Sequence, residues 1–163
     1  ATLASRQVTT GGRFINVEDD HNVDRPSYPH FGWAQDGSAF LASDGWDVWR
    51  VPVSGGAAVN LTQDGKAKGI RYGRPMMLEP RQRGINLAAP FLVTARVERT
   101  KREGILRVDP RAGRVTALDW KDARMVPMKA RNADVWVASI STAARYPDYW
   151  RVTWGGDSLR LTD

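Results

Sequence analysis

Short apolar runs separated by turn signals fill the chain, and the clearest series lies between Phe31 and Thr62. Runs rich in Val, Trp, Phe and Ala alternate there with the turn signals Asp36-Gly37, Asp44-Gly45 and Gly55-Gly56. Asp-Gly and Gly-Gly supply the positive φ angles that tight hairpin turns require. Because aromatic and β-branched residues favour strands, the pattern predicts four short antiparallel strands, as in one blade of a β-propeller.

An apolar-Arg-Val step recurs along the chain as Trp49-Arg50-Val51, Leu106-Arg107-Val108 and Trp150-Arg151-Val152. In the first and third copies an Asp stands two residues before the Trp, and a Leu-Thr pair follows further on. Each step is expected in the third strand of a unit, and units of this length are typical of propeller blades. The sequence predicts an all-β fold, a partial β-propeller with about three four-stranded antiparallel blades in a single segment, with a leading strand at residues 5–10 and blades at about 28–64, 67–119 and 124–163.

The middle unit is the longest because residues 79–89 are additional, and we expect them to form a loop or a hairpin extension. Pro residues interrupt the chain too often for a long helix. We expect the large rings to pack between blades, because aromatic side chains dominate cores. The rings in question are Trp33, Trp49, Trp136, Trp150 and Trp154.

Composition excludes some functions and leaves others open. The 163 residues include no Cys, which excludes disulfides and thiol chemistry. No apolar run reaches the roughly 18 residues of a membrane-spanning helix. The net charge of +6 is scattered along the chain, so nucleic acid is not an expected partner. The chain begins at Ala1, which is consistent with a processed or truncated piece, and its compartment is left open.

The order of these motifs resembles the propellers of the TolB-like and prolyl-oligopeptidase-type proteins. The run from Trp33 to Gly65 carries the W-x-x-D-G, D-x-W-x-V and L-T features of such blades. The resemblance extends from about Asp24 onward and is closest to the dipeptidyl-aminopeptidase branch. It rests further on Ile70-Arg71-Tyr72, Leu78-Glu79-Pro80, Arg99–Gly104, Lys129–Asp134 and Tyr146-Pro147-Asp148.

The resemblance implies a non-catalytic propeller segment of a serine peptidase, which gates the access of peptide substrates to an α/β-hydrolase domain absent from this chain. Its expected partners are the remaining blades and the hydrolase domain of a parent protein, or another copy of itself. The alternative is a TolB-like propeller that acts as a protein-interaction module without an enzymatic domain. Sequence beyond Asp163 would distinguish the two readings.

The residues themselves assign no catalytic, cofactor-binding or metal-ligating group, and no cofactor is expected. The Gly-x-Ser-x-Gly elbow of an α/β-hydrolase is missing, as is the Glu-Glu pair of the aminopeptidase branch. Gly156-Asp157-Ser158-Leu159 spells the nucleophile block of another esterase family. In that family the catalytic Asp and His stand far downstream of this block, whereas only residues 160–163 follow it here. We therefore interpret Ser158 as the start of a strand.

Three further clusters are interpreted as structural. Carboxylates and an imidazole at residues 18–24 could ligate a divalent cation, but adjacent Asp19 and Asp20 should point apart in extended chain. A solvated acidic connector is the preferred interpretation. The glycosylation signal at Asn60 is attributed to chance. A cluster of basic residues, which we call the basic turn, is interpreted as a solvated hairpin. The basic turn comprises Arg96, Arg99, Lys101 and Arg102.

Overall fold

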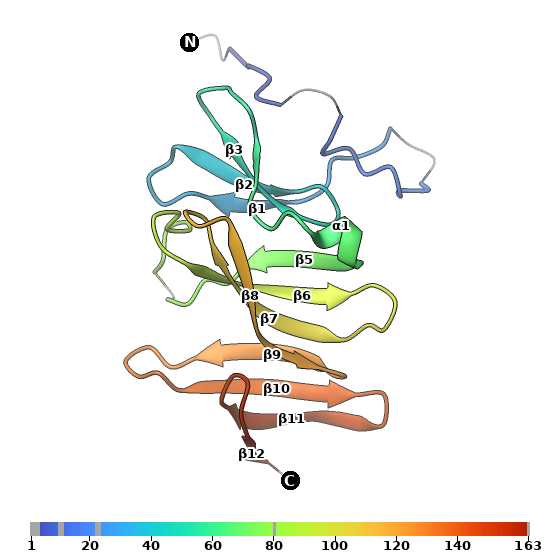
Figure 1. The fold of residues 1–163 in the computed structure, drawn as a ribbon, viewed down its shortest axis with the longest axis vertical. Coiled ribbons are helices and arrows are strands. Elements are labelled where there is room, and N and C mark those ends of the chain that lie inside the picture. Colours follow the sequence, from blue (N-terminus) through green and yellow to red (C-terminus); the bar gives the residue numbers. More distant parts are fainter. Residues whose placement is uncertain (1–3, 10–11, 22–23, 80, 163) are drawn as a thin grey trace.

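A computed structural model describes residues 4–9, 12–21, 24–79 and 81–162, and shows three antiparallel four-stranded sheets stacked in series (Figure 1). Sheet 1 contains β1 (His30–Trp33), β2 (Ala39–Ser43), β3 (Val48–Pro52) and β4 (Val59–Asn60). Sheet 2 contains β5 (Ile70–Pro75), β6 (Phe91–Val97), β7 (Glu103–Asp109) and β8 (Arg114–Lys121). Sheet 3 contains β9 (Arg124–Lys129), β10 (Trp136–Thr142), β11 (Arg145–Val152) and β12 (Ser158–Arg160).

This architecture confirms the prediction of an all-β partial propeller with three four-stranded units. In every sheet the strands follow one another in chain order, as in a propeller blade. Sheet 1 lies at the upper end of the stack in Figure 1 and sheet 3 at the lower end. The one helix of the described residues, α1 (Gly65–Lys68), is a single turn between sheets 1 and 2, and nothing among them has the length and apolarity of a membrane-crossing helix.

Each sheet has one face marked by an aromatic residue opposite a valine on the third strand. The cross-strand pairs are Phe40–Val51, Phe91–Val108 and Trp136–Val152. We call this side of a sheet its aromatic face. Residues directly opposite each other in an antiparallel pair share a face, so these pairs lie at equivalent positions of the three sheets.

The opposite side carries the repeated arginines, and we call it the arginine face. There the cross-strand pairs are Leu41–Arg50, Leu92–Arg107 and Val137–Arg151. The prediction that the three arginines occupy third strands is therefore confirmed, since β3, β7 and β11 are third in their sheets.

The sheets pack in a fixed order, with the arginine face of one against the aromatic face of the next. Leu41 of sheet 1 shares a core cluster with Phe91 and Val108 of sheet 2. Leu92 of sheet 2 packs in the same way on the cluster of Trp136 and Val152 of sheet 3. Val108 and Val152 are both buried at such an interface, so the second and third copies of the repeat mark a repeated packing interface.

A side-chain clasp closes the outer strand of sheets 1 and 3. In sheet 1 the Thr62 hydroxyl donates to Asp47 Oδ1 at 2.6 Å and accepts the Val48 N–H at 3.1 Å. In sheet 3 Thr162 holds the corresponding positions, accepting the Tyr149 N–H at 3.0 Å and lying 3.4 Å from Asp148 Oδ1. This clasp explains why Asp and Leu-Thr recur together in the first and third units.

Sheet 2 closes its outer strand without the clasp. Gly104 stands where the clasp has its Asp, and a Cβ there would lie 2.5 Å from the Trp120 ring. Strand β8 instead runs for eight residues and pairs with β7 from Glu103 to Asp109, whereas β4 has only two residues. Backbone pairing in sheet 2 thus replaces the side-chain bonds of the other two.

Two expectations for connecting segments have different outcomes. Of the additional residues 79–89, the described residues 79 and 81–89 form a loop, as predicted, and the loop buries Ile85 in the core between sheets 1 and 2. Its backbone pairs with sheet 1, where Ile85 N–H donates to Trp33 O at 2.8 Å. The leading strand at 5–10 is wrong for residues 5–9, which form no strand because no neighbouring strand pairs with them; Thr10 lies outside the described residues.

Gly37 provides a test of the first hairpin, because its φ of 70° lies in the left-handed region and a Cβ at this position would meet no neighbouring atom within 4 Å. We expect Gly37→Val to lower the free energy of unfolding by about 1 kcal/mol or more, since a β-branched residue is strained there. Urea denaturation would measure the change. Gly37→Asn should cost less, because Asn tolerates this conformation, and equal effects of the two variants would contradict the assignment.

Thr62→Val tests the clasp. Removing the hydroxyl leaves the buried Asp47 carboxylate with one donor fewer, so the free energy of unfolding should fall by about 1–3 kcal/mol. Thr162→Val is the matched control, because its exposed hydroxyl makes the longer contact, and its effect should stay within about 0.5 kcal/mol. Similar losses from both variants would show that burial of the clasp does not determine its contribution.

Candidate functional site

An open groove of about 490 Å³ lies at the junction of sheets 1 and 2. The β1–β2 turn, strand β3, the loop before β6 and the β7–β8 turn meet there. Its polar lining comprises Gln35, Asp36, Ser38, Arg50, Asn86 and Arg111. The groove thus brings together side chains from four segments that are far apart in sequence.

The groove carries an excess of positive charge. Asp36 Oδ1 accepts hydrogen bonds from Ser38 N–H at 2.9 Å and Ser38 Oγ at 2.7 Å. Those bonds, with a smaller contribution from the charge of Arg50, hold the pKa of Asp36 below its ordinary value. Neither Arg50 nor Arg111 forms an ion pair with an acidic side chain of the described residues. Guanidinium groups without a partner are suited to an anion such as a carboxylate, whereas the lining has no histidine to act as a base.

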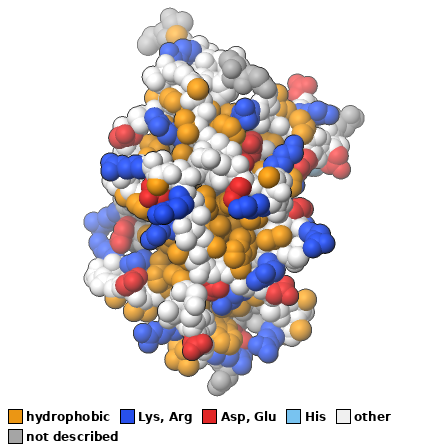
Figure 2. Space-filling model, in the orientation of Figure 1, with side chains coloured by type: hydrophobic (Ala, Val, Ile, Leu, Met, Phe, Trp, Pro, Cys, Tyr) orange, Lys and Arg blue, Asp and Glu red, His pale blue; other side chains and the backbone are white. Residues whose placement is uncertain are grey.

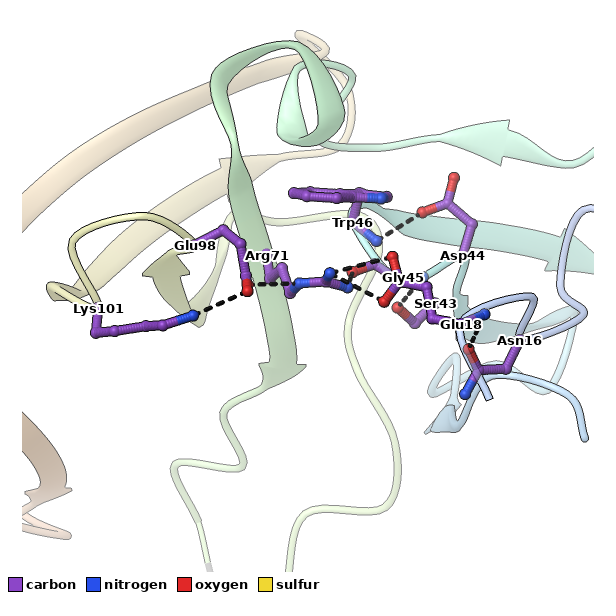
Figure 3. A network of polar contacts seen from close by, with 9 residues as sticks. All are labelled: Asn16, Glu18, Ser43, Asp44, Gly45, Trp46, Arg71, Glu98 and Lys101. Atoms are coloured by element: carbon purple, nitrogen blue, oxygen red, sulfur yellow. Dashed lines mark hydrogen bonds and ion pairs between the residues drawn. The ribbon is translucent and has the colours of Figure 1, made fainter. Parts of the chain in front are cut away.

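A second polar centre surrounds Arg71 on β5 (Figure 3). Its guanidinium donates to Glu98 Oε2 at 2.7 Å, to Glu18 Oε2 at 3.0 Å and to the Gly45 carbonyl at 3.0 Å. The same group lies 4.2 Å from the centre of the Trp46 ring. Arg71 therefore connects the segment before β1, the β2–β3 turn and the β6–β7 hairpin, and its charge is paired with two carboxylates of the chain.

Hydrogen bonds from Lys101 and Arg71 lower the pKa of Glu98 to about 2. The Lys101 ammonium lies 2.9 Å from Glu98 Oε1. This carboxylate offsets part of the charge of the basic turn, which we interpreted as a solvated hairpin. Arg96, Arg99, Lys101 and Arg102 are all exposed there.

The acidic connector differs from expectation in one respect. Ligand atoms of Asp19, Asp20 and His21 lie within 4.8 Å of one another, so the prediction that Asp19 and Asp20 point apart is wrong. The backbone turns here, with Asp19 N–H donating to Asn16 O at 3.3 Å, and this brings the two carboxylates to one side. Asp20 and His21 are exposed, Asp19 bonds to His21, and Glu18 pairs with Arg71 instead, so the segment has the character of a solvated turn.

The glycosylation signal at Asn60 is part of the clasp in sheet 1. Asn60 Nδ2 donates to Asp47 Oδ2 at 3.0 Å, and Asn60 Oδ1 accepts the N–H groups of Thr62 and Gln63. Leu61 and Thr62 are buried. A role in the fold accounts for all three residues of the signal.

Ser158 lies at the start of β12, where its Oγ is buried and has no hydrogen-bond partner among the described residues. His21 lies in the connector before sheet 1 and His30 in β1, at the opposite end of the stack (Figure 1). A serine nucleophile requires a base within hydrogen-bond reach, and this arrangement supplies none from the two histidines of the chain.

Three of these five tryptophans pack between sheets as expected. Trp136 is buried there, and Trp150 and Trp154 pack against the same cluster. Trp49 is also buried, but against Phe14 of the segment before β1 and not between sheets. Trp33 is 55% exposed although its ring contacts Phe40 edge-on, because it sits at the edge of sheet 1, where no other sheet of the described residues covers it.

Comparisons with family models, with curated proteins and with solved structures find no match to this chain. The interpretation of its function therefore depends on the fold, the groove and the sheet faces. Asp36 and Arg50 were noted in the sequence only as parts of a turn and of the repeat, and no residue of the groove was predicted to bind a ligand. The signal available was the repeat itself, which places Arg50 on the same face as Arg107 and Arg151.

Glu98 gives a test by pH. Its pKa in the folded chain is below the 4.5 of a free carboxyl, so its ionised form stabilises the fold above pH 4.5, and this contribution is lost as the pH falls toward 2. The unfolding midpoint of the unmodified chain should therefore fall more steeply over this range than that of Glu98→Gln. Glu79→Gln is a suitable control, because Glu79 lies 3.9 Å from an exposed Arg131. Parallel pH profiles for the chain and Glu98→Gln would contradict the role of Glu98.

Proposed function

We propose that this chain is a non-catalytic β-propeller segment of a prolyl-oligopeptidase-like serine peptidase, where it restricts the access of peptides to a hydrolase domain. The observation that carries the proposal is the serial packing of the three sheets, arginine face to aromatic face. Propeller blades pack face to face in the same serial order. A stack of this kind can form the rigid wall around an opening through which a peptide passes. The sequence resemblance supplies the peptidase part of the proposal.

A gate requires rigid walls, and two features of this chain favour rigidity. The Ile85 loop joins sheets 1 and 2 by backbone pairing, and Arg71 ties three segments together around one guanidinium. Both act between sheets, at positions where a loosely packed stack would open. Peptides would then be selected by the size of the opening that such a wall encloses.

The groove at Arg50 and Arg111 favours a second candidate function, a TolB-like module that binds another protein. Its guanidinium groups are open to solvent and suited to an acidic segment of a partner. This function needs no hydrolase domain. The two candidates therefore differ in what the parent protein contains, and not in the fold of this chain.

The sequence of the complete reading frame is the decisive experiment. A Gly-x-Ser-x-Gly elbow followed by Asp and His, about a hundred or more residues beyond Asp163, would support the peptidase. A fluorophosphonate probe should then label the complete protein and leave the 163-residue chain unlabelled. A complete reading frame without such a domain would overturn the peptidase proposal in favour of the interaction module.

We expect the 163-residue chain by itself to hydrolyse neither aminopeptidase nor ester substrates, because no histidine lies within hydrogen-bond reach of a serine hydroxyl among the described residues. Release of chromophore should equal that of buffer across a range of chain concentrations. Ser158→Ala, which removes the buried hydroxyl, should leave this result unchanged. Turnover that Ser158→Ala abolishes would contradict the assignment of the chain as non-catalytic.

A further inference from the structure

The arginine face of sheet 3 differs from its two counterparts because no sheet formed by the described residues covers it. Val137 pairs with Met128 and Arg151, and Arg151 pairs with Leu159. One step along the strands, Ser139 pairs with Val126 and Tyr149. These residues therefore share one face.

Apolar side chains on this face are open to solvent. The exposed fractions are 48% for Val126, 51% for Met128, 49% for Tyr149 and 62% for Leu159. Hydrophobic side chains reach the surface between Lys and Arg groups around the lower end of the molecule in Figure 2. A contiguous apolar area of this kind marks a surface that binds another protein element.

Equivalent positions in the other sheets show what such a face binds. Leu41 and Leu92 occupy the position of Val137, and each packs against a following sheet. The contact is made in each case by an aromatic–valine pair, Phe91–Val108 or Trp136–Val152. Because the arginine face of sheet 3 has the same pattern of residues, we expect it to bind an aromatic–valine pair of a further sheet.

The other end of the stack shows a different situation. On the aromatic face of sheet 1, Phe14 packs edge-on against Trp49 at 6.2 Å and Arg13 lies 4.2 Å from the same ring. Val51 is fully buried there. The segment before β1 thus covers that face around Trp49, although Trp33 on the same face is 55% exposed. A second copy of the chain would have to displace this segment in order to dock its sheet 1 on the exposed face of sheet 3.

We propose that the arginine face of sheet 3, centred on Val137, Tyr149 and Leu159, binds a further four-stranded sheet through an aromatic–valine pair. The partner is a fourth blade of the same propeller and not a second copy of this chain. The inference rests on the propeller part of the proposed function and is independent of the peptidase part. A parent protein without a hydrolase domain would leave it intact.

An extended chain tests the proposal, with residues 63–121 repeated directly after Thr162. Thr162 and Thr62 are equivalent, so the appended sheet would follow sheet 3 as sheet 2 follows sheet 1. The appended segment contributes only Tyr72 as a tyrosine, so Tyr146 and Tyr149 stay unique reporters. Nitration by tetranitromethane followed by peptide mass analysis would measure the reactivity of each ring.

Tyr149 should react readily in the 163-residue chain and at least fivefold more slowly in the extended chain. Tyr146, which is 92% exposed in the β10–β11 hairpin, should react equally in both and serves as the internal control. Phe91→Asp in the appended copy alone should restore the reactivity of Tyr149. Unchanged reactivity of Tyr149 in a folded extended chain would overturn the proposal.

A second measurement covers the case in which the extended chain does not fold. In the 163-residue chain, Leu159→Lys should leave the thermal unfolding midpoint unchanged and lower the binding of a hydrophobic dye severalfold. A large fall of the midpoint would show that the face is already covered within the chain. Light scattering that finds a dimer, with Tyr149 protected as concentration rises, would assign the face to a second copy instead. Either result would overturn the proposal.

Discussion

A four-stranded sheet has two faces, and in this protein each sheet buries its arginine face only against the aromatic face of the next. That constraint organises the molecule. Phe91 and Val108 of sheet 2 close the core over Leu41, and Trp136 and Val152 of sheet 3 close it over Leu92. Each interface excludes water from both partners, so no sheet is independent of its neighbour. The three sheets are accordingly joined by two successive interfaces, and the arginine face of sheet 3 is exposed to solvent.

Within a sheet, two different devices hold the outer strand. The Asp47–Thr62 clasp fastens a fourth strand of two residues, and the longer β8 relies on backbone pairing where Gly104 leaves no side chain to clasp with. Both devices satisfy the polar groups of the strand edge, which would otherwise be costly to bury. The glycosylation signal in sheet 1 has a structural explanation, because Asn60 and Thr62 both form hydrogen bonds in the buried clasp.

Among the described residues, the polar centres hold segments together or present positive charge, and no histidine lines the groove or bonds to Arg71. Arg71 uses its donors on Glu18, Glu98 and the Gly45 carbonyl. Arg50 and Arg111 present theirs to the groove. A chain of this kind can restrict the passage of a peptide or bind an acidic partner, and both proposals draw on that capacity. The exposed face of sheet 3 adds a third role, the docking of a further blade.

Local features of the sequence determined the strands, the turns and the three units, because hairpin turns and strand preferences depend on residues close together in the chain. The positive φ of Gly37 and the third-strand positions of Arg50, Arg107 and Arg151 follow from that level. Tertiary structure alone decided which face of each sheet is buried, because that requires contacts between residues of different sheets. It placed Ile85 in the core, left Trp33 exposed and gathered Glu18 and Glu98 around Arg71. These contacts join residues that are far apart in the sequence and meet only when the sheets stack, so they cannot be predicted from the residues next to each one in the chain.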